Sequence, residues 1–191
     1  VDVSHYRLSI HLIIAFFIIS LIFWNYLKIK IKNNKYNNLS FILPLSFLIL
    51  LYCQIIIGAF VSGMDAGQIY NTWPLMGSSL FPDDSKFINL FHFSAFNDPS
   101  LVQFMHRNLA YFIFLFYLIL FIKIYLNKLN RLYFAINLIG LFLVIQIFLG
   151  VLTLLYGAQI LIASMHQISS IFLVTSSIYI LYLNSNQQPL S

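Results

Sequence analysis

Long apolar runs alternate with short polar segments along the whole chain. Five runs reach or exceed the roughly 20 residues that a helix needs to cross a bilayer. Inside lipid the backbone N–H and C=O groups must be hydrogen-bonded within the protein, so each run is expected to form a helix. The pattern therefore predicts an all-α, polytopic integral membrane protein with five transmembrane helices, at Leu8–Leu27, Leu39–Phe60, Phe104–Leu126, Leu132–Leu155 and Gln159–Leu183.

The lengths of the connections predict how these helices pair. Only Tyr156–Ala158 separates the last two runs, and Asn127–Arg131 is nearly as short. Short connections join antiparallel neighbours, so the last four runs are expected to form an up-down four-helix bundle. The connection Val61–Ser100 is long and rich in Gly and Pro, which indicates an irregular loop. Within it, Lys86–Phe93 is expected to form a short interfacial helix.

Composition and charge support a membrane protein. Hydrophobic residues make up 61% of the chain and charged residues only 8%, too few to cover a soluble domain. Membrane proteins keep Lys and Arg on the cytoplasmic side, so the basic connections are expected to face the cytoplasm or matrix. This distribution favours the lipid bilayer, and not nucleic acid, as the partner of the basic residues. The two clusters are Lys28, Lys30, Lys32 and Lys35, and Lys123, Lys128 and Arg131.

Two histidines, His106 and His166, stand near the starts of the third and fifth runs. Ionisable groups inside a span are costly and mark functional sites. Both are expected on the order of 10 Å below the outer helix ends, and two neutral imidazoles at equal depth suit a hexacoordinate haem iron. The alternative is that each is a polar group satisfied by a neighbouring helix. Arg107 fits either a haem propionate or lipid headgroups.

A short repeat links these two histidines. Gln54-Ile-Ile-Ile-Gly58 matches Gln146-Ile-Phe-Leu-Gly150, and each run that carries the repeat precedes a run that carries a histidine. We interpret the last four runs as two parallel repeats, whose sites tend to form where the repeats meet. This predicts that the two histidines face each other across the bundle axis. Coincidence within a low-complexity apolar sequence is the alternative.

Three segments together resemble the haem A synthase family, and the similarity extends into the first run. They cover most of the sequence outside the lipid-facing stretches. The segments are Gly58-Ala-Phe-Val-Ser-Gly-Met-Asp65-Ala-Gly-Gln-Ile-Tyr-Asn-Thr-Trp73-Pro-Leu-Met-Gly77, Val102-Gln-Phe-Met-His106-Arg107 and Leu161-Ile-Ala-Ser-Met-His166-Gln167, with Val3-Ser-His-Tyr-Arg-Leu-Ser-Ile-His11-Leu in the first run.

The resemblance implies an eight-helix protein of two similar halves that oxidises a methyl group of haem O to the formyl group of haem A for terminal oxidases. By position, His106 and His166 resemble the pair that holds haem b, the electron relay, in the C-terminal half. His11 resembles a ligand of the substrate haem in the N-terminal half, with an interfacial histidine as the alternative. The chain then corresponds to the C-terminal portion, with about five of the eight helices, and is expected to be inactive alone.

The same resemblance implies haem O as substrate, with a haem O synthase and an electron acceptor as candidate partners. The expected location is a bacterial inner (plasma) membrane, with the mitochondrial inner membrane as the alternative. A non-catalytic b-type membrane cytochrome or haem carrier is the rival function, because the same two-histidine site would suffice for it.

We expect three parts in the chain. Residues 1–38 form an isolated transmembrane helix with a basic loop, residues 39–183 form the haem-binding bundle with the outer loop 61–100, and residues 184–191 form an inner tail. Asp65 is expected to serve a tight turn, since Gly63 and Gly67 flank it, with a contact to the haem rim as the alternative. Tyr70 and Trp73 are expected to be interface anchors.

Overall fold

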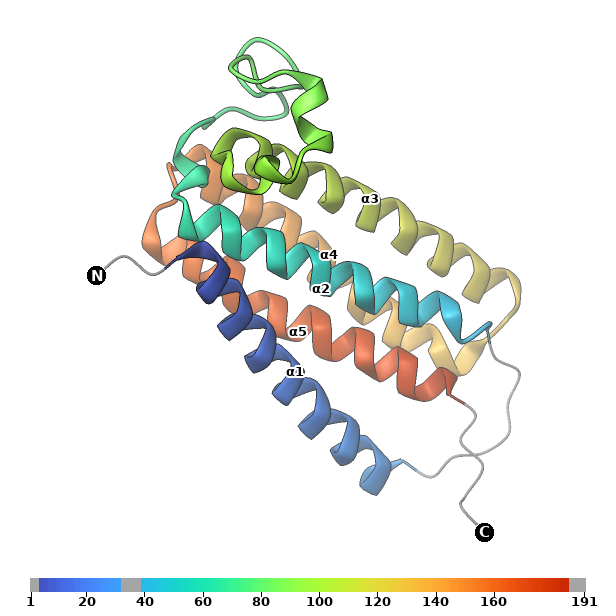
Figure 1. Ribbon diagram of the computed structural model, residues 1–191. Coiled ribbons are helices and arrows are strands. Elements are labelled where there is room, and N and C mark those ends of the chain that lie inside the picture. The colour runs from blue at the N-terminus through green and yellow to red at the C-terminus, as the bar shows by residue number, and fades with distance from the viewer. Residues whose placement is uncertain (1–3, 32–38, 186–191) are drawn as a thin grey trace.

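The computed structural model describes residues 4–31 and 39–185. Within them every regular element is helical, and five helices are long and apolar enough to cross a membrane. The predicted all-α, polytopic fold class is confirmed (Figure 1). The elements are α1 (His5–Lys30), α2 (Ile42–Gly63), the 3₁₀ turns η1 (Ala66–Gln68), η2 (Phe87–Phe91) and η3 (Phe93–Asn97), α3 (Pro99–Leu126), α4 (Asn130–Leu155) and α5 (Ile160–Asn184).

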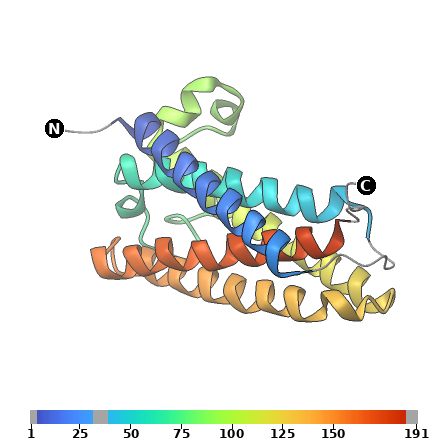
Figure 2. The same cartoon turned by 90° about the horizontal axis from the view of Figure 1, so that it is seen from below.

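Helices α2 to α5 form the predicted four-helix bundle. Both α2 and α4 pack against α3 and against α5, so α3 and α5 occupy opposite corners (Figures 1 and 2). Side chains from all four helices fill the space between them, among them Phe47, Ile113, Ile136 and Ile178, each at most 2% exposed. Other large apolar side chains of the same helices face outward, as lipid contact requires.

Helix α1 lies along this bundle and packs against α2 and α5. The hydroxyls of Ser20 and Tyr52 are 2.5 Å apart, and the Tyr182 hydroxyl donates to the carbonyl of Ile31 (3.2 Å). The helix that the sequence led us to treat as isolated is thus attached to the bundle along its length. The buried residues of α1 are Ser9, Phe16 and Leu27, and no sequence signal distinguishes them from the rest of the helix. Three predicted features lie outside the described residues. They are the boundary at residue 38, the basic residues Lys32 and Lys35, and most of the tail 184–191.

The end of the bundle that carries the long loop is called the outer end here, in line with the predicted orientation. The segment Lys86–Phe93, expected to be a short helix, contains the 3₁₀ turn η2 and ends in extended backbone at His92. A second 3₁₀ turn, η3, follows it. Each turn closes through hydrogen bonds between residues three apart, such as Asn89 N–H to Lys86 O (2.9 Å), which suits short helical pieces. Tyr6 of α1 donates to Asn97 of this loop (2.9 Å).

Helix α3 starts at Pro99, five residues before the predicted Phe104. Oδ1 of Asp98 accepts hydrogen bonds from the backbone N–H groups of Ser100 (3.0 Å) and Leu101 (3.2 Å). An acidic N-cap followed by proline is a strong start signal for a helix. The cap therefore extends the helix beyond the apolar run and places His106 two turns inside it.

Candidate functional site

His106 is held between α3 and α2 by two residues of the sequence repeat. Nε2 of Gln54 donates to the backbone carbonyl of His106 (3.0 Å) and lies 3.3 Å from its ring Nε2. One turn further along α2, a Cβ built on Gly58 would lie 3.0 Å from Cε1 of the ring. The imidazole therefore rests against the α2 backbone where glycine alone leaves full room for it.

His166 lies in a matching environment between α5 and α4. Nε2 of Gln146 donates to the backbone carbonyl of His166 (3.0 Å). A Cβ on Gly150 would lie 3.1 Å from Cε1 of His166 and 3.6 Å from Nδ1, the latter equal to the distance found between Gly58 and His106. The repeat seen in the sequence is confirmed as a repeat in space. We call Gln54 with Gly58 the α2 pair, and Gln146 with Gly150 the α4 pair.

The two environments differ in their further contacts. The amide of Gln54 reaches a ring nitrogen of His106 as well as its carbonyl, whereas Gln146 bonds only the carbonyl. The carbonyl of His166 accepts a second hydrogen bond, from the Ser169 hydroxyl (3.0 Å). Nδ1 of each ring is buried and has no hydrogen-bond partner among the described residues. Buried polar atoms without partners are uncommon and mark places where a partner from outside the chain is expected.

The histidine positions suit a cofactor between the helices. His106 lies seven residues after the start of α3 and His166 six residues after the start of α5, which is about 10 Å of helix in both cases at ~1.5 Å per residue. Both helices start at the outer end, on opposite corners of the bundle. The described residues hold no group of three or more His, Cys, Asp or Glu side chains that would bind a metal ion alone. A low-spin haem iron needs only two imidazoles from the protein, because the macrocycle supplies its other ligands.

Arg107, next to His106, binds the long outer loop. Its Nη1 donates to the carbonyls of Thr72 (2.9 Å) and Leu75 (3.2 Å), and its Nη2 donates to the carbonyl of Tyr70 (2.8 Å). Gln103, one turn earlier, also donates to the Tyr70 carbonyl (3.2 Å). The loop thus uses both terminal nitrogens of the guanidinium. Nε remains buried without a partner in the described chain, and the pairing of Arg107 with a haem propionate stays a prediction.

Further contacts connect this loop to both repeats. Nδ2 of Asn71 donates to the carbonyl of Leu154 at the outer end of α4 (2.8 Å), and Trp73 Nε1 donates to the Tyr111 hydroxyl on α3 (3.1 Å). We call residues 66–76 the outer strap. It contacts the outer ends of α3 and α4, near the depth of the two histidines. Trp73, expected to be an interface anchor, is half exposed and also binds the protein.

Two loop aspartates organise the backbone beyond the strap. The Ser100 hydroxyl donates to Asp84 (2.7 Å) and holds the pKa of that carboxyl below its ordinary value. The backbone N–H and hydroxyl of Ser78 likewise lower the pKa of Asp83. Burial raises the pKa of the Tyr70 hydroxyl, and the neighbouring Asp84 adds to this. Both aspartates are therefore charged at neutral pH and act as acceptors within the loop.

The other predicted site residues lie apart from the histidine pair. His11 is exposed on α1 and belongs to neither pair's surroundings, so its role as a substrate ligand stays a prediction. Asp65 adopts left-handed backbone (φ 51°) and precedes η1, in agreement with the expected turn. Sequence reasoning noticed Gln54 and Gln146 only as a repeat and missed Asn71. The signal for the two glutamines was their spacing, since each lies one turn before a glycine in α2 or α4.

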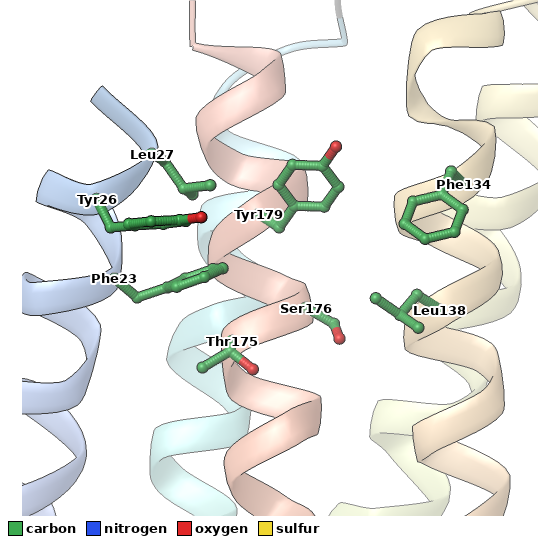
Figure 3. A pocket seen from close by; sticks show the side chains of 8 residues that line it. All are labelled: Phe23, Tyr26, Leu27, Phe134, Leu138, Thr175, Ser176 and Tyr179. Atoms are coloured by element: carbon green, nitrogen blue, oxygen red, sulfur yellow. The ribbon is translucent and has the colours of Figure 1, made fainter. Parts of the chain in front are cut away.

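An apolar groove of about 240 Å³ lies toward the opposite end of the molecule. Figure 3 shows its lining from three helices: Phe23, Tyr26 and Leu27 of α1, Phe134 and Leu138 of α4, and Thr175, Ser176 and Tyr179 of α5. The hydroxyls of Thr175 and Ser176 donate to carbonyls of their own helix, which leaves the surface apolar. Neither histidine lines this groove, so it is separate from the candidate site.

Comparison with known proteins shows which family the chain matches. The family model described as "Cytochrome oxidase assembly protein" matches residues 1–178. Relatives include the heme A synthases of Pelagibacter ubique (45% identical over 97% of this chain and 54% of the relative), Rickettsia africae (38%, 95% and 55%) and Rickettsia bellii strain OSU 85-389 (39%, 97% and 56%). The chain spans about half the length of the curated relatives it matches. No solved structure matches it.

Proposed function

The chain belongs to the haem A synthase family of cytochrome oxidase assembly proteins, and from this premise we propose that it forms part of an enzyme that oxidises a methyl group of haem O to the formyl group of haem A. Water supplies the oxygen atom, and an external acceptor takes the electrons. Support comes from relatives with this name that cover 95–97% of the chain. Because these relatives are bacterial, we place this multi-pass protein in a bacterial inner membrane.

In this proposal His106 and His166 hold a resident haem b through their imidazoles. A bis-histidine haem supplies one-electron redox chemistry, which serves as the relay to the acceptor. The single observation that carries the proposal is the matched placement of the two rings. Each is half-buried at a similar depth beside a glycine, on opposite corners of one bundle, with its Nδ1 buried and unpaired in the described chain.

The substrate site involves other residues. We propose His11 as a ligand of haem O, because the segment that carries it shares the family motif. His11 is exposed on α1, so the described helices form no enclosed site around it. The chain as given is therefore expected to bind haem b without completing the reaction.

The test of the resident site is the optical and EPR spectrum of purified protein. His106→Ala and His166→Ala are each expected to abolish the low-spin haem signal, because a hexacoordinate iron needs both imidazoles. Cys53→Ala is the control, since Cys53 is exposed on α2 beside Gln54. An unaltered low-spin signal in His166→Ala would show that the ligand assignment is wrong.

A further inference from the structure

We propose that the α2 pair and the α4 pair are positioning residues, which fix the orientation of the His106 and His166 rings toward the haem iron. The inference rests on the proposed haem site and extends it to four residues that themselves bind no iron. Each pair performs two separate tasks. The glutamine fixes the height of the histidine along the bundle, and the glycine fixes the position of its ring.

The glutamines act on the backbone. Gln54 and Gln146 each donate to the carbonyl of the histidine on the adjacent helix, at 3.0 Å in both cases. A hydrogen bond between helices inside a membrane restricts sliding of one helix against the other. Because each carbonyl belongs to the histidine itself, the bond sets where along the bundle that residue's side chain begins.

The glycines act on the ring. At Gly58 and Gly150 the three nearest atoms that an added Cβ would meet are all imidazole atoms of the facing histidine, starting at 3.0 and 3.1 Å. Contacts this short require the neighbour to move by a few tenths of an ångström. The α2 backbone at Gly58 therefore limits the His106 ring on one side, and the α4 backbone at Gly150 limits the His166 ring in the same way.

Other glycines of the chain serve different purposes, which separates this role from general helix packing. A Cβ on Gly63 would meet backbone and Cβ atoms of His5 at 2.8 Å, where α1 and α2 approach closely. A Cβ on Gly67 would meet the Cβ of Ala158 at 3.3 Å. Only Gly58 and Gly150 among these four face an imidazole ring, and they do so at equivalent positions of the repeat.

The experiment substitutes each glycine with alanine in the full chain loaded with haem b. The g-values of a low-spin ferric haem depend on the angle between its axial imidazole planes, so EPR reports ring orientation directly. Gly58→Ala and Gly150→Ala are each expected to shift the g-values and weaken haem binding by roughly 10- to 100-fold, the usual effect of losing a group that orients a metal ligand. Gly67→Ala is the matched control, expected to retain wild-type g-values and affinity.

Substitutions of the two glutamines provide a second test, and they add no bulk to the contacts between the helices. Gln54→Met and Gln146→Met keep the side-chain length and remove the donor, and both are expected to broaden the EPR signal and lower haem affinity. They decide the matter if an alanine variant fails to fold, as judged by circular dichroism.

The positioning role is overturned if both alanine variants show wild-type g-values and affinity. If an alanine variant does not fold, the same result in both methionine variants overturns it. Either result leaves the proposed haem site intact. Failure of the proposed function gives a different result. In that case the wild-type protein shows no low-spin haem, or the histidine variants retain it, and the positioning role falls with it.

Discussion

Arg107 illustrates how one side chain organises a loop that the sequence leaves irregular. Its two terminal nitrogens bind three carbonyls within residues 70–75. A guanidinium suits this task because its donors are fixed in one plane and point in different directions. The residue after the first proposed ligand therefore links the histidine helix to the outer strap.

We predict that Arg107→Leu loosens the strap. The change removes the Arg107 hydrogen bonds to all three carbonyls, although the Tyr70 carbonyl keeps its bond from Gln103 and the Leu75 carbonyl keeps its bond from the Thr72 hydroxyl. Each lost hydrogen bond is expected to cost about 0.5–1.5 kcal/mol. Amide hydrogen exchange of residues 66–76 is expected to accelerate, with less effect in Arg107→Lys, which keeps the charge and one of the contacts. Equal exchange in Arg107→Leu and the wild type would favour a role at lipid headgroups or at a propionate.

At the scale of elements, two aspartates connect the outer loop to the start of α3. Asp98 caps the helix, and Asp84 accepts from Ser100, which is 2% exposed. The Ser100 hydrogen bond favours the charged form of Asp84 in the folded loop. Ionisation of this carboxyl is therefore linked to the folding of the loop around the α3 N-terminus.

We predict that the loop loosens in acid. The folded pKa of Asp84 is lowered, so its contribution is fully present above the unfolded carboxyl value of about 3.9 and is lost as the pH falls through the lower folded value. The emission of Trp73 in a Trp24→Phe background is expected to stay constant from neutral pH to about pH 5 and to change below about pH 4. Asp84→Asn should reduce this change, because Asp84 accepts from Ser100 of α3. Asp83→Asn should retain most of it, because Asp83 accepts from Ser78 within the loop. An equal transition in Asp84→Asn would assign the effect to another group.

The sequence predicted the helices well because apolar length alone defines a membrane span. The largest shift, at the start of α3, arose because Asp98 and Pro99 determine that helix end, whereas the apolar run begins later. The depth of both histidines was also predictable from helix boundaries. The partners of Arg107 were not, since backbone carbonyls some 30 residues away leave no trace in residue identity.

The contact between α1 and the bundle shows the same limit at the scale of the whole molecule. Its apolar side chains gave no reason to choose bundle or lipid, yet α1 packs on α2 and α5. The internal repeat was more informative, because it joined two polar residues and two glycines at one spacing. The structure shows that both copies hold a histidine, and the two copies together bring the proposed ligands to opposite sides of one bundle.

We predict that this chain, expressed as it stands in cells that make haem O, binds haem b but produces no haem A. Helices α2 to α5 contain both proposed ligands and both pairs that position them. His11 is exposed on α1, and oxidation of one methyl group requires the substrate to be held in a fixed geometry. The measurement is haem extraction followed by chromatography.

The Pelagibacter ubique relative, of which this chain covers 54%, serves as the positive control, and His166→Ala of this chain serves as the negative control for haem b. A rival b-type cytochrome or carrier also predicts haem b alone, so the decisive arm adds the remaining part of the relative as a second polypeptide. Membrane helices associate by packing after insertion, and haem A is then expected only if this chain is half of an enzyme. Appreciable haem A from the chain alone would instead move the active site to the bundle that holds His106 and His166.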